Sequence, residues 1–422
     1  MDKLIIQGGK RLEGEIQISG AKNAALPLMA STILAPGKHR LENVADLKDI
    51  LTMAELLENL GAKVDRSNLS SKKILEIDTT EIKSQRAPYE LVKTMRASIL
   101  VLGPLYARFE RAEVSFPGGC AIGARPVDQH LKGLEMLGAK ISVEHGYIYA
   151  EKQDSHPNEI TFDMVTVTGT ENMMMASVFT PGKTVLLNTA QEPEVVCLAE
   201  YLNKMGAKIK GAGTDRIEVI GVDNLEPKTH RIIPDRIEAG TYLVAGAITA
   251  GDIVLKNAEP RHMEAVIVKL REAGVKIEES AEGLRVWRKG KLKGVDIRTA
   301  PYPGFPTDMQ AQMMALLSIA EGSVSVITET IFENRFQHAL ELQRMGANIR
   351  MDGNRALVSG VSKLTGAKVM ATDLRASASL VLAGLAAENT TEVSRVYHLD
   401  RGYERMEEKL NAVGARIKRV KE

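Results

Sequence analysis

The stretch "LENLGAKV" at residues 57–64 recurs in slightly altered form along the whole chain. The other copies are "LEMLGAKI" (134–141), "LNKMGAKI" (202–209), "LREAGVKI" (270–277), "LQRMGANI" (342–349) and "LNAVGARI" (410–417). Their glycines are separated by 77, 68, 68, 72 and 68 residues. Each copy is typical of a helix that ends at a glycine in a left-handed conformation and is followed by a strand. Six copies at a near-constant spacing predict one supersecondary unit of roughly 70 residues, used six times.

A second pattern, a helix rich in small residues, recurs in step with the first. Examples are "GAKNAALPLMASTILAPGK" (20–38), "RIEAGTYLVAGAITAGD" (236–252) and "DLRASASLVLAGLAAEN" (373–389). These helices carry few charges along their length, which favours burial on nearly all sides. Most of them run into a β-branched stretch that is typical of a strand. We therefore predict α/β units in which helices and strands alternate and the small-residue helices are buried.

The sixth unit stops early, because the chain ends soon after its glycine motif. A strand pair that could complete it occurs at the other end of the chain, in "KLIIQGGKRLEGEIQIS" (3–19). We therefore expect two α/β domains of three units each, residues 20–230 and residues 231–422 joined by 1–19. The break falls in a polar, proline-containing stretch suited to a linker. An open solenoid of six units is the alternative architecture.

Composition narrows the class of protein. The chain has 422 residues, of which 44% are hydrophobic and 26% charged, with a formal net charge of +1. This near-equal number of positive and negative charges does not indicate broad binding to nucleic acids or membranes. Two cysteines cannot form a disulfide framework, and no signal peptide or membrane-spanning stretch is evident. We expect a cytoplasmic monomer whose partners are small molecules.

Polar groups gather at the starts of the small-residue helices. For the aspartates among them, helix capping and a role in ligand binding or catalysis are equally good explanations. Capping does not explain the cations, because the helix dipole disfavours positive charge at a helix start. A cation beside a positive helix end suggests a bound anion such as phosphate. The residues at these starts are Lys22, Asn23, Arg96, Thr170, Glu171, Asp235, Arg236, Glu238, Asp308, Asp373 and Arg375.

One cysteine lies in an unusual loop, "SFPGGCAIGARPVDQH" (115–130). Glycines flank Cys120, and Arg125 nearby would favour a thiolate or hold an anionic substrate against the thiol. We interpret Cys120 as a reactive group on a lid, whereas Cys197 lies on an apolar helical face and is expected in the core. The loop lacks the Gly-Lys-Ser/Thr of a P-loop. No dinucleotide-binding fingerprint and no His/Cys cluster occurs, so we expect neither an organic cofactor nor a metal.

Longer motifs resemble a known family. "GAKNAALPL", "TMRAS", "FPGGCAIGARPVDQH", "FPTDMQAQ", "ITETIFENRF", "DLRASASL" and "HLDRGYE" together resemble the MurA type of the enolpyruvyltransferase family. The resemblance runs from Lys3 to the C-terminus. It implies two inside-out α/β barrels of three units each, with the active site in the cleft between them. It also implies transfer of enolpyruvyl from phosphoenolpyruvate to the 3′-hydroxyl of UDP-N-acetylglucosamine, the committed step toward peptidoglycan.

The resemblance also implies roles for individual residues. Cys120 would protonate C3 of phosphoenolpyruvate or add to it covalently, and Asp308 would be the general base. The cations that would clamp phosphate and carboxylate are Lys22, Arg125 and Arg401, with Arg96 and Arg375 close by. Asn23 and Asp373 would orient the reacting centre.

The nucleotide sugar would lie along a second set of residues. These are Arg125, Pro126, Val127, Asp128, Gln129, Thr166 and Val167, with a backbone contact from Ile331. Met164 departs from the family pattern, since a lysine often stands there. The alternatives are the related enzyme that uses shikimate 3-phosphate and, in another class, a non-catalytic repeat scaffold. The "GGCAIGARP" loop favours the nucleotide sugar over the first, and the varied charged groups at one repeat position disfavour the second.

Overall fold

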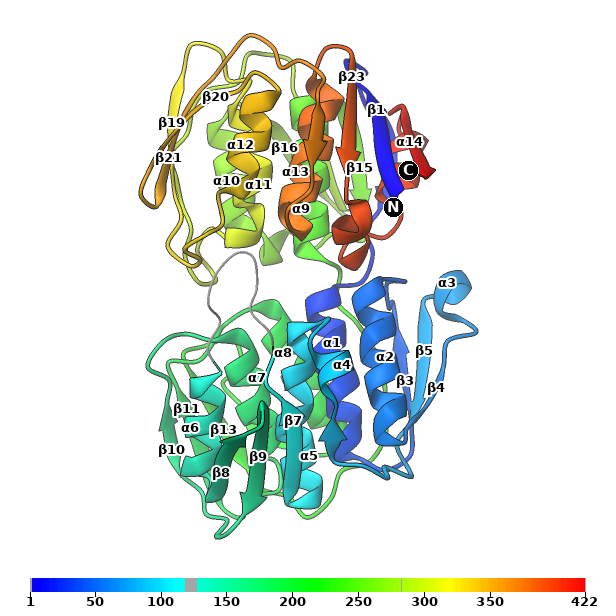
Figure 1. The fold of residues 1–422 in the computed structure, drawn as a ribbon, viewed down its shortest axis with the longest axis vertical. Coiled ribbons are helices and arrows are strands. Elements are labelled where there is room, and N and C mark those ends of the chain that lie inside the picture. Colours follow the sequence, from blue (N-terminus) through cyan, green and yellow to red (C-terminus); the bar gives the residue numbers. More distant parts are fainter. Residues whose placement is uncertain (1, 118–126, 282, 422) are drawn as a thin grey trace. The chain divides into compact units, whose positions relative to one another are not determined.

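The computed structural model describes residues 2–117, 127–281 and 283–421. The chain divides into two compact lobes (Figure 1). Lobe A contains residues 20–117 and 127–233, and lobe B contains residues 2–19 and 234–421. Each lobe has its own hydrophobic core.

Lobe A contains three four-stranded sheets. In sheet order, the first is β14 (Thr229–Arg231), β3 (Lys38–Glu42), β5 (Ile74–Asp78) and β4 (Lys63–Asp65). The second is β6 (Arg86–Ala87), β7 (Arg111–Ser115), β9 (Tyr147–Lys152) and β8 (Ala139–Glu144). The third is β10 (Glu159–Thr161), β11 (Lys183–Leu187), β13 (Arg216–Ile220) and β12 (Lys208–Lys210).

Lobe B repeats this arrangement. Its first sheet is β2 (Glu13–Gln17), β15 (Asp252–Lys256), β17 (Gly283–Trp287) and β16 (Lys276–Ser280). The second is β18 (Ile297–Arg298), β19 (Val324–Thr328), β21 (Arg355–Ser359) and β20 (Asn348–Asp352). The third is β22 (Lys368–Met370), β23 (Thr390–Ser394), β1 (Asp2–Gln7) and β24 (Ile417–Lys421). In all six sheets the first two strands are parallel and the remaining pairs are antiparallel. The predicted α/β class built from one repeated unit is confirmed.

Strands from distant parts of the sequence close each lobe into a ring. In lobe A, β14 at the end of the lobe pairs with β3 at its beginning. In lobe B, β1 lies between β23 and β24, and Figure 1 shows it in blue next to β23. The next strand, β2, pairs with β15 in the first sheet of lobe B, as β14 pairs with β3 in lobe A, so the two N-terminal strands complete the sixth unit as expected. In the other four sheets the parallel outer strand comes from the preceding repeat along the chain, whereas in the first sheet of each lobe it comes from the last repeat of that lobe.

The helices fall into a buried set and an amphipathic set. The buried set is α1 (Lys22–Ser31), η2 (Arg96–Val101), α5 (Leu102–Phe109), α7 (Val167–Ala176), α9 (Arg236–Ile248), α11 (Gln310–Leu317) and α13 (Leu374–Ala386). The amphipathic set is α2 (Lys48–Leu60), α6 (Asp128–Met136), α8 (Pro193–Met205), α10 (Glu264–Glu272), α12 (Gln337–Arg344) and α14 (Met406–Ala412). Short turns of helix are α3 (Leu69–Lys72), α4 (Tyr89–Val92), η1 (Thr32–Leu34), η3 (Pro260–His262), η4 (Thr307–Met309) and η5 (Val396–Arg401). In α9 every residue after Arg236 is buried, as the small-residue pattern predicts. No described helix is long and apolar enough to cross a membrane.

The six repeat glycines adopt the predicted left-handed backbone. Their φ angles are 114° at Gly61, 89° at Gly138, 117° at Gly206, 89° at Gly274, 89° at Gly346 and 102° at Gly414. At Gly138 a Cβ atom would lie only 1.5 Å from the carbonyl oxygen of Asp154. The left-handed conformation therefore favours glycine at all six positions, and at Gly138 the lack of space also requires it.

Candidate active site

The polar centre of lobe B is built around Asp308, which lies in η4 immediately before α11. One oxygen, Oδ1, accepts a hydrogen bond from Nη2 of Arg335 at 2.7 Å. The other, Oδ2, accepts from Nε of Arg375 at 2.9 Å and lies 2.8 Å from its Nη2. The side chains of Arg335 and Arg375 are only 5% and 4% exposed, whereas that of Asp308 is 28% exposed. One carboxylate thus joins two buried guanidinium groups and keeps a solvent-accessible side.

The charge state of Asp308 follows from these contacts. Burial alone would raise the pKa of its carboxyl, but Arg375 and Arg335 outweigh burial and hold that pKa well below its usual range. The group is therefore an anion at neutral pH. While both arginines contact it, it is also a weak base.

The three aspartates at helix starts in lobe B have different local roles. Asp235 caps α9, with Oδ1 accepting from the backbone N–H of Ile237 at 2.8 Å and of Glu238 at 2.9 Å. Asp373 caps α13 in the same way, accepting from the N–H of Arg375 at 2.8 Å. Capping and function were equally open for all three from sequence. Only Asp308 directs its carboxylate to arginine side chains instead of the backbone N–H groups of its helix.

A hydrogen-bonded chain leads from the Asp308 centre to Ile331. Nη1 of Arg335 donates to Oγ1 of Thr307 at 2.9 Å, and Thr307 donates to Oε2 of Glu329 at 2.8 Å. Oε1 of Glu329 accepts from the backbone N–H of Ile331 at 2.8 Å. A backbone contact from Ile331 to a ligand would therefore come from its carbonyl oxygen. Sequence reasoning did not assign Arg335, although it lies in the quoted motif "ITETIFENRF".

Lys22 in lobe A is compensated by a protein anion. It is the first residue of α1 and 9% exposed, and its Nζ lies 2.9 Å from Oδ2 of Asp49 in α2. This ion pair offsets the cost of a cation at a helix start. The next residue, Asn23, is exposed. Lys22 therefore presents an ammonium group that an incoming anion would share with Asp49.

The expected nucleotide-binding residues of lobe A lie at the starts of two helices. Val127 and Asp128 begin α6, and Thr166 caps α7 through the N–H of Gly169 at 3.2 Å, with Val167 as its first residue. The side chain of Gln129 binds Asp163 twice, accepting from its N–H at 2.8 Å and donating to Oδ2 at 3.1 Å. Met164, where the family often has lysine, is 59% exposed.

His130 is a buried histidine of α6. It is 2% exposed, and its Nδ1 lies 2.9 Å from Nδ2 of Asn172 while its Nε2 lies 3.3 Å from Oγ1 of Thr168. Burial, and then the charge of Arg96, lower its pKa to about 4. The imidazole is therefore neutral, and it joins α6 to α7 close to the half-buried Arg96 at the start of η2.

A second buried carboxyl, Glu171, lies in α7. Burial, then Glu194 and Glu192, raise its pKa well above the ordinary value. Its Oε1 is buried and has no hydrogen-bond partner among the described residues. Burial without a partner therefore favours the protonated form of Glu171 in the folded protein. In the described ranges, no three His, Cys, Asp or Glu side chains are grouped so as to hold a metal ion.

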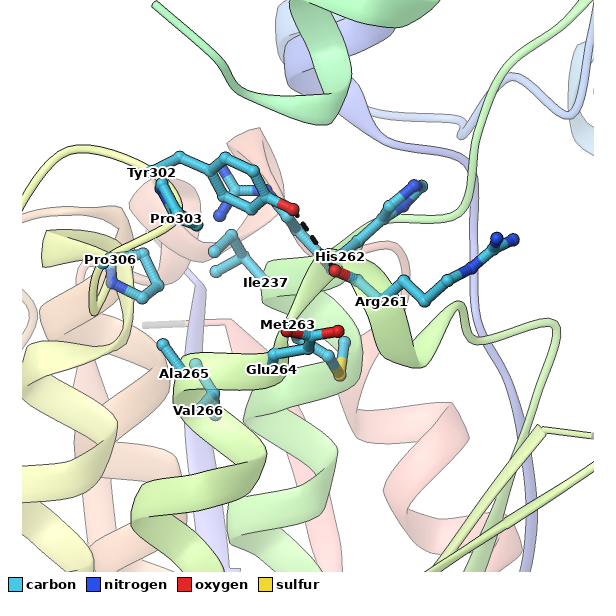
Figure 2. Close-up of a pocket in the computed structure, with 12 residues that line it drawn as sticks. Ile237, Arg261, His262, Met263, Glu264, Ala265, Val266, Tyr302, Pro303 and Pro306 are labelled. Carbon is cyan, nitrogen blue, oxygen red and sulfur yellow. Dashed lines mark hydrogen bonds between the residues drawn. The ribbon is translucent and has the colours of Figure 1, made fainter. Parts of the chain in front are cut away.

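The remaining candidates are distributed as follows. Arg236 lines a small cavity of about 20 Å³ beside Tyr302, whose hydroxyl donates to the carbonyl oxygen of Arg261 at 3.2 Å (Figure 2). That volume suits about one water molecule and excludes a nucleotide sugar. Arg401 is the half-buried last residue of η5. Cys120, Arg125 and Pro126 lie outside the described residues.

Two α/β lobes of repeated units are also the fold of solved enolpyruvyl transferases. The chain belongs to the family described as EPSP synthase (3-phosphoshikimate 1-carboxyvinyltransferase), which matches residues 6–410. The predicted family is thereby confirmed.

Curated relatives refine this assignment. The chain is 58% identical, over the full length of both, to proteins of Geotalea uraniireducens and Geobacter metallireducens named UDP-N-acetylglucosamine 1-carboxyvinyltransferase. A Myxococcus xanthus protein of that name is 56% identical over the full length of both chains. Among solved structures, the enolpyruvyl transferase NikO from Streptomyces tendae matches with a TM-score of 0.87 at 25% identity, covering 99% of each chain. EPSP synthase from Acinetobacter baumannii shares the fold, with a TM-score of 0.76 at 19% identity over both whole chains.

Proposed function

We propose that the protein transfers the enolpyruvyl group of phosphoenolpyruvate to the 3′-hydroxyl of UDP-N-acetylglucosamine and releases phosphate. The observation that carries this proposal is the identity of 54–58% over essentially the whole chain to enzymes named for that acceptor. The likeness to the shikimate-type enzyme is only 19% in sequence. A non-catalytic scaffold does not account for the full-length identity to relatives named as transferases. The protein is therefore a transferase of peptidoglycan synthesis, and we expect it to act as a cytoplasmic monomer.

The reaction can be written as an addition followed by an elimination. The acceptor oxygen forms a bond to C2 of phosphoenolpyruvate, its proton goes to a base, and C3 gains a proton, which gives a tetrahedral ketal. C3 then loses a proton, the C2–O bond to phosphate breaks, and the alkene re-forms on the sugar. We assign the base to Asp308 and the C3 proton to Cys120. A well-placed acid or base contributes about 10²–10⁴-fold to such a step.

Substrate binding must increase the basicity of Asp308. Arg375 uses Nε and Nη2 on Asp308, while its Nη1 is buried without a hydrogen-bond partner among the described residues. Nη1 is therefore a donor suited to a substrate carboxylate. An anion that draws the guanidinium groups toward itself weakens their hold on Asp308 and raises the pKa of that carboxyl. In this proposal the base becomes competent only when the anionic substrate is bound.

The other predicted residues complete the proposal. Lys22, Arg125 and Arg401 bind phosphate and carboxylate with Arg96, and Asn23 and Asp373 orient the reacting centre. The nucleotide sugar contacts Arg125, Pro126, Val127, Asp128, Gln129, Thr166, Val167 and the carbonyl of Ile331. We propose two domains, roughly residues 20–230 and residues 231–422 with 1–19, close to the limits of the two lobes at residues 233 and 234.

Phosphate release from phosphoenolpyruvate tests this function. We expect release that depends on UDP-N-acetylglucosamine and that is absent when shikimate 3-phosphate replaces it. Release only with shikimate 3-phosphate would reverse the choice of acceptor. No release with either acceptor would contradict the transferase assignment.

A further inference from the structure

A cluster of three buried polar side chains lies beneath the Asp308 centre. Tyr403 follows η5, Thr241 lies in α9 and Gln312 lies in α11, so the cluster joins three elements of lobe B. Their exposed fractions are 2%, 0% and 0%. Oη of Tyr403 lies 2.8 Å from Oγ1 of Thr241, and Nε2 of Gln312 lies 3.1 Å from that Oγ1 and 3.3 Å from Oη.

The direction of these hydrogen bonds follows from counting protons. The single hydroxyl proton of Thr241 is donated to the backbone carbonyl of Ile237 at 2.7 Å. Oγ1 of Thr241 must therefore be the acceptor toward Tyr403, and the phenol proton points to Thr241. The lone pairs of the Tyr403 oxygen remain available to positive or donating groups. Gln312 supplies one such donor.

The cluster contacts both members of the Asp308–Arg375 ion pair. The guanidinium carbon of Arg375 lies 5.3 Å from the centre of the Tyr403 ring, within cation–π range. Nε2 of Gln312 donates to the backbone carbonyl of Asp308 at 2.9 Å. Tyr403 thus limits where the guanidinium can lie, and Gln312 limits where the main chain of Asp308 can lie.

We propose that Tyr403, fixed by Thr241 and Gln312, is a positioning residue that sets the orientation of Arg375 toward Asp308 and the substrate carboxylate. This inference rests on the roles given above to Asp308 and Arg375. Tyr403 acts through the arginine, and its hydroxyl need not touch the substrate. Without that hydroxyl, the ring still fills the core, but the hydrogen bonds to Thr241 and Gln312 that fix the ring beside Arg375 are lost.

The same lobe offers a matched control. Tyr242, in α9, is fully buried like Tyr403. Its hydroxyl, however, has no hydrogen-bond partner among the described residues. Tyr242→Phe and Tyr403→Phe therefore remove the same atom from equally buried rings, and only the second change alters the support of Arg375.

Steady-state kinetics with the full-length protein distinguishes these effects. For Tyr403→Phe we expect the KM for phosphoenolpyruvate to rise about 5–30-fold, the loss expected for one or two hydrogen bonds near a charge. The KM for UDP-N-acetylglucosamine should stay within about twofold, and Tyr242→Phe should leave both constants within about twofold. Thr241→Val, which removes the acceptor of the phenol proton, should shift the phosphoenolpyruvate constant in the same direction.

Three results would overturn the proposal. Equal kinetic constants for Tyr403→Phe and Tyr242→Phe would show that the hydroxyl does not position Arg375. A parallel rise in the KM of both substrates would indicate a general structural effect. Wild-type protein without transferase activity would refute the proposed function, on which this inference depends. Active wild-type protein with unchanged kinetic constants in Tyr403→Phe would refute the positioning role alone.

Discussion

Asp308→Asn tests how one carboxylate serves both stability and catalysis. The amide has almost the same shape but carries no negative charge and cannot accept a proton at neutral pH. Arg335 and Arg375 would then remain buried, at 5% and 4% exposure, without their shared counter-ion. The substitution should therefore reduce both the free energy of unfolding and turnover.

The magnitude follows from the burial of the three groups. Removing one partner of a buried ion pair costs about 3–5 kcal/mol, and the partial exposure of Asp308 favours the lower end, about 3 kcal/mol. For a lobe of about 200 residues, this loss lowers Tm by about 6–12 °C. Loss of the base should reduce kcat by about 10²–10⁴-fold. Because the pKa of Asp308 is depressed, its stabilising effect is present above its ordinary value of 3.8 and is lost as pH falls through the lower folded-state pKa.

Asp252→Asn provides the control. Asp252 forms a two-point ion pair with Arg285 at 2.9 and 2.8 Å in the same lobe, but the arginine side chain is 49% exposed. This surface pair should contribute little to Tm, and the variant should keep wild-type turnover. Calorimetry and phosphate release are measured on both variants. The reasoning is refuted if Asp308→Asn unfolds at the temperature of Asp252→Asn, or if it keeps more than about a tenth of wild-type kcat.

Three further results are expected. An electrophilic phosphonate epoxide such as fosfomycin should label Cys120 and leave Cys197 unmodified, because Cys197 is 1% exposed and burial raises the pKa of its thiol to about 12; peptide mass mapping that finds label on Cys197 would contradict this. The Tm of Glu171→Gln should rise relative to that of wild type as pH increases above 4.5, because the raised pKa of Glu171 makes wild type lose stability over that range. A Tm difference that is constant from about pH 5 to about pH 8 would contradict the buried-acid interpretation. Gly138→Ala should lower Tm more than Gly146→Ala. Both glycines have positive φ, but a Cβ would lie 1.5 Å from a backbone oxygen at Gly138 and would have nothing within 4 Å at Gly146. Equal Tm values would refute the steric argument.

The repeat was predictable because its determinants are local. A glycine at a helix end requires only the conformation of its own backbone, and all six repeat glycines show it. The position of β2 was not predictable in this way. Its pairing with β15 depends on which sheet lacks a parallel outer strand, and that is a property of the closed lobe rather than of residues 13–17.

In the candidate site, too, local features were predictable from the sequence and contacts between distant residues were not. Asp235, Asp308 and Asp373 look alike in sequence because each stands at a helix start. Their different roles depend on partners far away along the chain, since Arg335 and Arg375 lie 27 and 67 residues from Asp308. The resemblance identified Asp308 and Arg375 as site residues, but only the structure shows that Arg375 binds Asp308 directly and that Arg335 binds its other oxygen.

The product of the reaction in D₂O tests the central claim most directly. C3 of phosphoenolpyruvate gains a proton during addition and loses one during elimination, so it exchanges hydrogen with the active-site acid and the solvent. We predict UDP-N-acetylglucosamine carrying one enolpyruvyl group on the 3′-oxygen, with deuterium in its vinyl position, as measured by NMR and mass spectrometry. A product free of deuterium, enolpyruvyl on another oxygen, or phosphate released without any modified nucleotide sugar would contradict the account.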